Sequence, residues 1–195
     1  MGRMKDRMLR GELYNGADED MVADFSRAQE LLARFNGAAP AEQAERDALL
    51  VELLGSVGDG VHVRPPFHLE YGTRVSIGAG TFINFGCVML DVVEITIGAA
   101  CQVATCVQFL TATHPIDPGP RRLGWEYAEP ISVGDNVWLG GGAILCPGVT
   151  IGDDTVVGAG AVVTRDLPAG VVAVGSPARV LREIGERDRV EVPEL

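Results

Sequence analysis

The sequence VGDNVWLGGGAILCPGVTIGDDTVVGAGAVV, residues 133–163, repeats a pattern of six residues. In each hexad the first residue is large and apolar, a glycine commonly follows it, and the fifth residue is small or β-branched. The large apolar position is occupied by Val133, Leu139, Leu145, Ile151, Val157 and Val163. A helix with 3.6 residues per turn cannot keep this period. The pattern predicts short strands that turn every six residues and stack as the coils of a solenoid.

The same period extends upstream of this stretch. It begins at Tyr71, is shifted by two extra residues near 92–95, and resumes at Ile97. The large apolar residues of these earlier hexads are Tyr71, Ile77, Ile83, Met89, Ile97, Val103 and Phe109. Stacked coils lie one strand spacing apart, roughly 4.8 Å, and bury a continuous core. We therefore expect an all-β solenoid over residues 59–177.

The repeat is interrupted between Thr113 and Val133. Residues 115–132 have the length of three hexads but lack the pattern, and they contain four prolines and two glycines. Proline and glycine at this density are typical of a loop. Because a loop this long in a compact domain usually serves function, we expect residues 115–132 to project from the solenoid as a functional loop.

The segments on either side of the repeats have helical spacing. Residues 18–36 place apolar side chains on one face, and Asp18 or Asp20 is a suitable N-cap. Residues 41–57 carry a stripe of leucines, and residues 178–185 are a further short helix candidate. The predicted organisation is a helical segment, 1–58, the solenoid, 59–177, and a C-terminal helix and tail, 178–195.

The composition excludes several classes of protein. The chain carries 16 basic and 27 acidic residues, a net charge of -11, and nucleic-acid binding needs a basic surface instead. The longest uncharged stretch, residues 95–116, is too polar to cross a membrane, and no signal peptide is evident at residues 1–10. The four cysteines have no metal or redox spacing, so we expect buried free thiols and a cytoplasmic protein.

Of the three histidines, His114 has the most distinctive setting. It ends a hexad and opens the proline-rich loop in the sequence TATHPIDP, residues 111–118. Pro115 favours an extended backbone at position 114, which fixes the imidazole at the rim of the solenoid. From spacing alone, His114 is either a surface residue bonded to its own loop or a general base at neutral pH. We interpret His62 and His68 as structural or surface residues.

Several motifs together resemble the maltose and galactoside O-acetyltransferases. They are GELY at 11–14, YG at 71–72, NF at 84–85, MLD at 89–91, THP at 113–115, NVWLG at 136–140, PGVTIG at 147–152 and GSPAR at 175–179. These enzymes are hexapeptide-repeat proteins, so the resemblance implies a left-handed parallel β-helix with three flat faces. It also implies an acetyl-CoA-dependent O-acetyltransferase that forms homotrimers, with CoA in a groove between subunits. The implied acceptor is a hydroxyl of a sugar such as maltose, glucose or a galactoside.

The resemblance implies roles for three residues on the acceptor side. His114 matches the family's catalytic base, which takes the proton of the acceptor hydroxyl as that oxygen attacks the thioester. Asn84 and Asp91 match residues that help to hold the acceptor. The residues by themselves leave simpler roles open, since an asparagine at a turn can cap its own backbone and an aspartate beside the two-residue insertion can fix that bulge.

On the cofactor side, the resemblance implies contacts with CoA from Gly141, Ala159, Thr164, Arg165, Arg179 and Arg182. Arginines suit the 3′-phosphate and pyrophosphate of CoA, although each is equally compatible with an ordinary solvated charge. Gly141 stands where the galactoside enzymes have a serine near the thioester, which leaves the backbone N–H to bind the oxyanion. Arg165 stands where a lysine is common. This chemistry needs no metal.

Two other functions are considered for a hexapeptide solenoid. A γ-class carbonic anhydrase binds zinc through histidines that include an HxxxxH pair, which this chain lacks. A solenoid that has lost catalysis would be a scaffold or binding protein, but the retained His114, Asn84 and arginines argue against it. Acetyl-CoA turnover with a panel of sugars distinguishes an enzyme from a scaffold.

Overall fold

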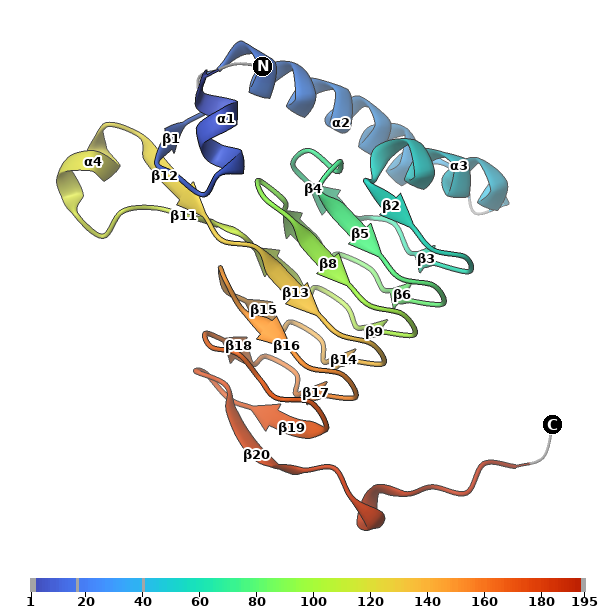
Figure 1. The fold of residues 1–195 in the computed structure, drawn as a ribbon. Helices are drawn as coiled ribbons and strands as arrows, with labels where there is room; N and C mark the ends of the chain where they lie inside the picture. Colours follow the sequence, from blue (N-terminus) through green and yellow to red (C-terminus); the bar gives the residue numbers. More distant parts are fainter. Residues whose placement is uncertain (1–2, 17, 40, 194–195) are drawn as a thin grey trace.

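The computed structural model describes residues 3–16, 18–39 and 41–193, and its centre is a solenoid of parallel coils (Figure 1). Its strands form three sheets, which we name the first, second and third faces in chain order. The first face contains β2 (Ser56–Val57), β5 (Val75–Ile77), β8 (Ile95–Ile97), β13 (Ile131–Val133) and β16 (Thr150–Ile151). The second contains β3 (His62–Val63), β6 (Phe82–Ile83), β9 (Gln102–Val103), β14 (Trp138–Leu139), β17 (Val156–Val157), β19 (Val171–Val174) and β20 (Arg179–Glu183). The third contains β4 (His68–Leu69), β7 (Val88–Leu90), β10 (Gln108–Leu110), β15 (Ile144–Leu145) and β18 (Val162–Val163).

Tight corners join the faces. The turn after a second-face strand, such as residues 84–86, belongs to the second corner, and the segment after a third-face strand, such as residues 91–94, belongs to the third corner. Backbone amides bond each coil to the next one at these corners. The N–H of Arg64 donates to Ile83 O at 2.9 Å, and the N–H of Asn84 donates to Val103 O at 2.9 Å. Equivalent residues of successive coils therefore form files along each corner.

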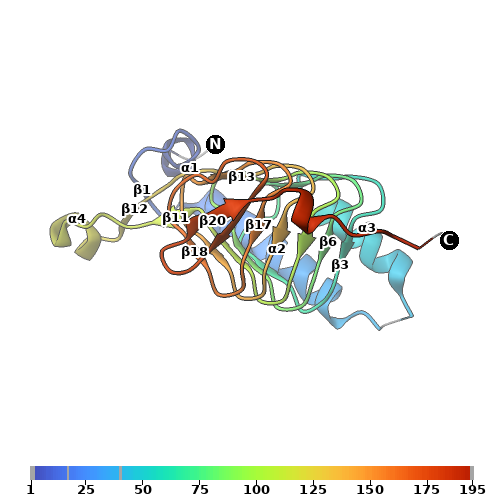
Figure 2. The same ribbon diagram turned by 90° about the horizontal axis from the view of Figure 1, so that it is seen from below.

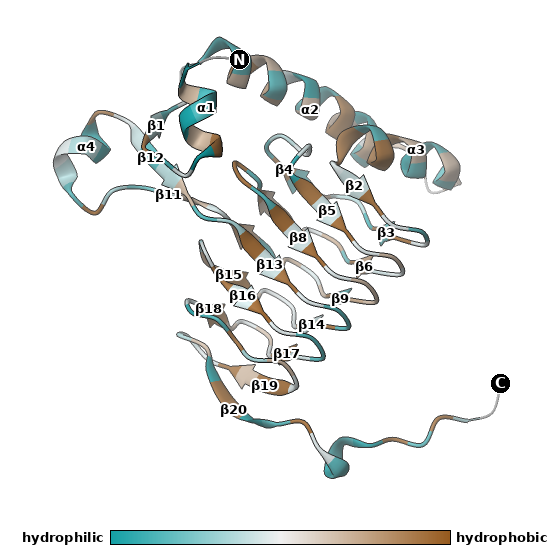
Figure 3. Ribbon diagram, in the orientation of Figure 1, coloured by the Kyte–Doolittle hydropathy of each residue, from teal (hydrophilic) through white to brown (hydrophobic). Residues whose placement is uncertain are grey.

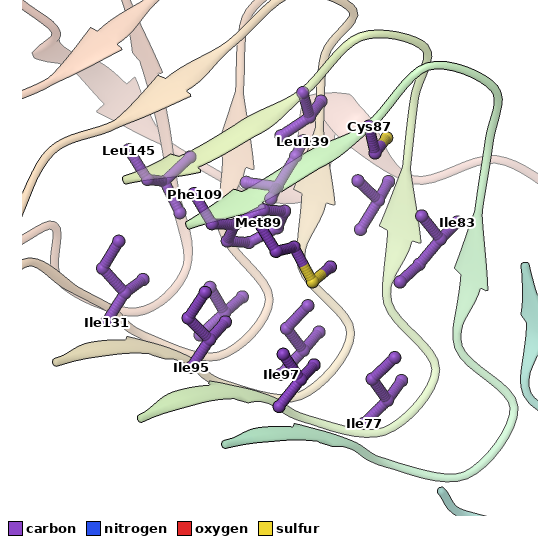
Figure 4. Packing of buried hydrophobic residues seen from close by; sticks show 14 of the residues in the cluster. Ile77, Ile83, Cys87, Met89, Ile95, Ile97, Phe109, Ile131, Leu139 and Leu145 are labelled. Carbon is purple, nitrogen blue, oxygen red and sulfur yellow. The ribbon is translucent and has the colours of Figure 1, made fainter. Parts of the chain in front are cut away.

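The large apolar residue of each hexad points into the solenoid. Phe109 pairs with Met89 on one side and Leu145 on the other, and all three are fully buried (Figure 4). The glycine after the large residue allows the coils to approach, because a Cβ added to Gly78 would lie 2.5 Å from the backbone of Gly98. The predicted solenoid, with one large inward residue per hexad, is confirmed.

The outward residues differ from face to face. On the first face the outward position is a hydroxyl residue between two buried aliphatic ones, as the pale middles of β5, β8 and β13 show in Figure 3. On the third face the outward positions of successive strands are mostly aliphatic and half-buried. These are Val88, Leu90, Leu110, Ile144 and Val162. The third face is therefore apolar on both of its sides.

The interruption of the repeat projects from the solenoid, as predicted. It leaves through β11 (Ala112–Thr113), turns at α4 (Pro118–Arg122) and returns through β12 (Trp125–Ala128) (Figures 1 and 2). β12 pairs antiparallel with β11 and also with β1 (Tyr14–Asn15) near the N-terminus. The loop thus has secondary structure of its own and contacts the N-terminal segment.

Helices close the N-terminal end of the solenoid. α2 (Glu19–Gly37) and α3 (Gln43–Leu53) lie across the first coil, and α1 (Arg3–Leu9) precedes β1 (Figure 1). Asp18 caps α2 by accepting from Asp20 N at 3.1 Å, which confirms one of the two predicted caps. The prediction of two helices is confirmed, although α3 ends at Leu53 because residues 56–57 already pair as β2. The sequence did not predict α1.

The predicted C-terminal helix is wrong. Within residues 178–185, β20 pairs antiparallel with β19, and a single 3-10 turn, η1 (Glu186–Asp188), follows. The last parallel strand offers unpaired backbone groups at its edge, and β20 satisfies them, whereas a helix this short gains little on its own. Residues 1–2 and 194–195, the ends of the predicted flanking segments, lie outside the described residues.

Two of the four cysteines differ from the prediction of buried thiols. Cys87 and Cys101 are buried and free, whereas Cys106 is exposed and Cys146 is half-buried. Cys106 occupies a second-corner turn, where its φ is 59°. This turn places Cys106 outside the core. None of the described helices is long and apolar enough to cross a membrane.

Candidate active site

His114 lies at the third corner, where the chain leaves the solenoid for the projecting loop. Its side chain is exposed, and no hydrogen bond joins it to another residue within the described ranges. The chain just beyond it is held by Arg121, whose Nη1 donates to Pro115 O at 3.0 Å and to Ile116 O at 2.8 Å. The imidazole therefore projects from a fixed backbone, and the alternative of a histidine bonded to its own loop is not observed.

Asp91 lies on the same corner but is completely buried. Its carboxylate accepts three backbone N–H groups, from Glu70 at 2.9 Å, Tyr71 at 3.0 Å and Gly72 at 2.6 Å. Burial raises the pKa of Asp91, and these backbone hydrogen bonds oppose that rise. These hydrogen bonds join the carboxylate to segment 70–72 and not to the insertion near 92–95, which the simpler role expected Asp91 to fix.

Further acidic and phenolic side chains gather beside Asp91. Glu126 of β12 accepts a hydrogen bond of 3.1 Å from the hydroxyl of Tyr14, which is 1% exposed. Burial, followed by the charges of Asp91 and Glu126, raises the pKa of Glu70 to about 7. Glu70 Oε2 is buried without a hydrogen-bond partner among the described residues. The sequence did not reveal this cluster, because its members meet only when the loop and the N-terminal strand fold onto the solenoid.

Asn84 and Gly141 lie on the second corner. The Asn84 side chain accepts from Phe85 N at 2.9 Å, so it caps its own turn, as the simpler interpretation expects. Gly141 bonds the next coil through its carbonyl, which accepts from Gly160 N at 2.9 Å. Its N–H has no partner within the described ranges and remains available to a ligand. Ala159 lies one coil further along and is exposed.

Arg165 and Arg179 lie together at the C-terminal end of the solenoid. They line a small pocket of about 140 Å³ with Asp166, and Thr164 precedes Arg165 on the third corner. The remaining lining residues are Leu167, Ala178 and Val180. Two of the three arginines expected at the phosphates of CoA are therefore neighbours.

Arg182 is placed differently from the other two arginines. Its guanidinium donates two hydrogen bonds of 2.7 Å to the carboxylate of Asp188 in η1. The hydrogen bond from Arg182 lowers the pKa of Asp188 to about 2. The charge of Arg182 is thus paired within its own chain.

The expected site residues divide between two corners. Asn84, Gly141 and Ala159 lie on the second corner, whereas Asp91, His114, Thr164 and Arg165 lie on the third. The third face separates these two groups of residues in one chain. Among the described residues, no group of three or more histidine, cysteine or acidic side chains is arranged to hold a metal ion.

Comparisons with known proteins agree with this arrangement of elements. A family model described as the maltose acetyltransferase hexapeptide capping motif matches residues 7–58, and one described as bacterial transferase hexapeptide (six repeats) matches residues 130–165. The chain is 50% identical to nodulation protein L of Rhizobium meliloti (strain 1021) over 176 residues, which cover 90% of this chain and 96% of that protein.

Two solved structures have closely similar folds. A maltose O-acetyltransferase from Clostridium difficile 630 superposes with a TM-score of 0.92 at 43% identity, covering 94% of this chain and 98% of that one. A galactoside acetyltransferase in complex with coenzyme A also gives a TM-score of 0.92, at 37% identity, covering 95% of this chain and 92% of that one.

The left-handed β-helix of hexapeptide repeats, its helical cap and the likeness to a CoA-bound acetyltransferase together identify an acetyl-CoA-dependent acetyltransferase. The chain belongs to the maltose and galactoside O-acetyltransferase family of hexapeptide-repeat acyltransferases.

Proposed function

We propose that this acetyltransferase transfers the acetyl group of acetyl-CoA to a hydroxyl of a sugar, with His114 as the general base. The observation that carries the proposal is the position of His114, exposed and without a partner in the described structure, on a backbone fixed by Arg121. An imidazole held in this way can act as a general base toward an acceptor hydroxyl. The relatives named for maltose and galactosides support a sugar as the acceptor.

The reaction is a direct transfer. His114 takes the proton of the acceptor hydroxyl while its oxygen attacks the carbonyl carbon of the thioester. The carbon–sulfur bond then breaks, and the CoA thiolate leaves and takes up the proton from the imidazolium. The N–H of Gly141 stabilises the negative charge that develops on the carbonyl oxygen, since an oriented donor is most effective where charge develops.

The complete site forms between two copies of the chain in a homotrimer. Asn84 and Gly141 lie on the second corner, and His114 lies on the third, so a single solenoid keeps them on opposite sides of its third face. The outward aliphatic residues of that face, such as Leu110 and Ile144, support burial of the face against another copy. One copy would then supply His114, and its neighbour would supply Asn84 and Gly141.

The remaining residues have supporting roles in this proposal. Asn84 orients the acceptor, and Asp91 does so indirectly, by fixing the backbone of residues 70–72 on the same corner as the base. Arg165 and Arg179 bind the phosphates of CoA, with Ala159 and Thr164 along the same groove, and Arg182 contributes at its edge. The arginines form charge-assisted hydrogen bonds that suit these phosphate groups.

The test is a screen of acceptors with acetyl-CoA, followed by the release of free CoA thiol. Maltose, glucose and galactosides should each be tried with the wild-type enzyme and with His114→Ala. Thiol release that requires both a sugar and His114 supports the proposal. Release that is independent of His114, or that no sugar stimulates, contradicts it.

A further inference from the structure

A second pocket, of about 470 Å³, lies where the second corner meets the linker between α2 and α3. Its walls include Arg46 and Gln43 from the first turn of α3, and His62, Arg64 and Phe85 from the first two coils. None of the described residues that line this pocket is acidic. In a chain with a net charge of -11, a concave surface with two arginines and no carboxylate among its described residues is a local site of positive potential.

Arg64 is fixed by aromatic rings on two sides. Its guanidinium carbon lies 5.1 Å from the ring centroid of Phe82 and 5.1 Å from that of Phe85. The ring of His62 also stacks on Phe82, with ring centroids 5.8 Å apart and planes inclined by 4°. Stacking holds the plane of a guanidinium while leaving the N–H donors at its edge free to bind an anion.

Arg64 belongs to none of the ion pairs formed between described residues, even though the chain has 27 acidic side chains. Arg46, which is 7% exposed, donates to Ala39 O at 2.6 Å and to Gln43 Oε1 at 2.8 Å. These hydrogen bonds hold the Arg46 guanidinium in place at the wall of the pocket.

The pocket adjoins Asn84, on the acceptor side of the proposed active site. Arg64 and Asn84 belong to the same file on the second corner, because Arg64 N donates to Ile83 O at 2.9 Å. They are therefore about one coil, roughly 4.8 Å, apart along the solenoid. Phe85, which follows Asn84, forms a wall of the pocket. A sugar held at Asn84 can thus extend a charged substituent toward Arg64.

We propose that this pocket binds the anionic group of a sugar, a phosphate or a carboxylate, and so selects an anionic sugar as the acceptor. Arg64 binds the anion, and Phe85, which lines the pocket and is exposed, provides the apolar surface on which a sugar ring packs. The selection of the acceptor rests on the proposed function, whereas the anion site itself does not.

Direct binding tests the site without acetyl transfer. Isothermal titration of the full-length protein, without acetyl-CoA, should be carried out with glucose 6-phosphate, glucuronate, glucose and inorganic phosphate. Glucose 6-phosphate, glucuronate or both should bind about 10- to 100-fold more tightly than glucose, which is the worth of one charge-assisted contact. The phosphate and carboxylate sugars then identify the anion that is preferred, and inorganic phosphate should bind more weakly than the sugar phosphate because it lacks the ring.

Arg64→Gln should remove most of this preference for anionic sugars. The matched control is Arg189→Gln, which removes the same charge from the exposed C-terminal tail and should leave binding unchanged. Equal binding of glucose and both anionic sugars by the wild-type protein would overturn the proposal. An unchanged affinity in Arg64→Gln, or an equal loss in both variants, would overturn it as well.

A kinetic measurement connects the site to catalysis. With an anionic sugar as the acceptor, Arg64→Gln should raise KM about tenfold or more while kcat changes little, because the contact holds the ligand away from the reacting atoms. If no sugar accepts acetyl but binding of anionic sugars still depends on Arg64, the proposed function fails and the anion site stands. A KM that is the same in Arg64→Gln and the wild type contradicts acceptor selection.

Discussion

Arg182 and Asp188 form an ion pair in which both guanidinium donors lie 2.7 Å from carboxylate oxygens. Arg179, three residues earlier, donates to the neighbouring carbonyl of Ala178 at 2.7 Å and has no carboxylate partner in the described structure. Arg179 and Arg182, two of the three arginines expected at CoA, therefore differ in how much of their charge is available. A ligand phosphate must compete with Asp188 for Arg182, but not for Arg179.

This difference predicts unequal effects on the affinity for CoA. Arg179→Ala should weaken CoA binding about 10- to 100-fold, and Arg182→Ala should weaken it less. The measurement is titration of both variants with CoA and with its 3′-dephospho form, at low and high salt. A contact with the 3′-phosphate is indicated if the loss is much smaller for dephospho-CoA, and full CoA affinity in Arg179→Ala would place the groove elsewhere.

Replacement of the base should abolish most of the turnover. His114→Ala should lower kcat roughly 10²- to 10⁴-fold, the usual contribution of a positioned general base. The side chain is exposed and forms no hydrogen bond with a described residue, so the fold should be unaffected. Circular dichroism must match the wild type for the comparison to count, and a variant that keeps more than about a tenth of the turnover would refute the assignment of His114.

Mixing two inactive variants should restore activity if the site lies between copies. In assemblies formed from equal amounts of His114→Ala and Asn84→Ala chains, about a quarter of the interfaces in a cyclic trimer combine an intact His114 with an intact Asn84. Co-expressed chains should therefore recover on the order of a quarter of wild-type turnover.

The oligomeric state provides the control for that experiment. Light scattering should give three times the chain mass of 20.6 kDa for the wild type and for each variant. A particle of one chain mass, or mixed assemblies no more active than the single variants, would show that one chain forms the site by itself.

Glu70 should make the protein less stable as the pH rises. Its pKa is raised from 4.5 in the unfolded chain to about 7 in the folded one, with burial as the main cause. The stabilising contribution is therefore complete below pH 4.5 and is lost as the pH rises toward 7. Glu70→Gln should raise the free energy of unfolding above pH 7 by about 1–2 kcal/mol, after allowance for solvent screening, and change it little near pH 4.5.

Urea unfolding at several pH values measures this effect. Glu30→Gln is the matched control, because it removes the same charge from an exposed position of α2. The pH dependence should be flatter in Glu70→Gln than in Glu30→Gln. Identical pH profiles for the two variants would mean that Glu70 ionises as it does in the unfolded chain.

Local patterns predicted the parts of this molecule that repeat. The hexad fixes the inward position of residues such as Met89 and Phe109, since the same contact recurs in every coil. It also locates the loop after His114, where the pattern stops. Local spacing predicts a helix where β20 forms, because the partner of β20 is the open edge of β19, which is a property of the assembled solenoid.

The candidate site was only partly accessible from the sequence for a similar reason. Motifs indicated His114, Asn84 and the arginines, but they gave no distances between the corners. The contacts among Tyr14, Glu70 and Glu126 join residues up to 112 positions apart in the chain, and no spacing marks such pairs. The ion pair between Arg182 and Asp188 likewise depends on the fold of the C-terminal segment.

A stack of parallel coils of constant width could be extended without limit, because every unpaired strand at its end is a template on which another molecule can pair. At one end, the side chain of Asn36 in α2 donates to the carbonyl of Phe67 at 2.8 Å and accepts from its backbone N–H at 2.9 Å. At the other end β20 runs antiparallel to β19 and reverses the direction of the chain. Growth of the stack into fibres is thereby blocked at both ends, which leaves the long sides of the solenoid as the surfaces through which copies can associate into a finite particle.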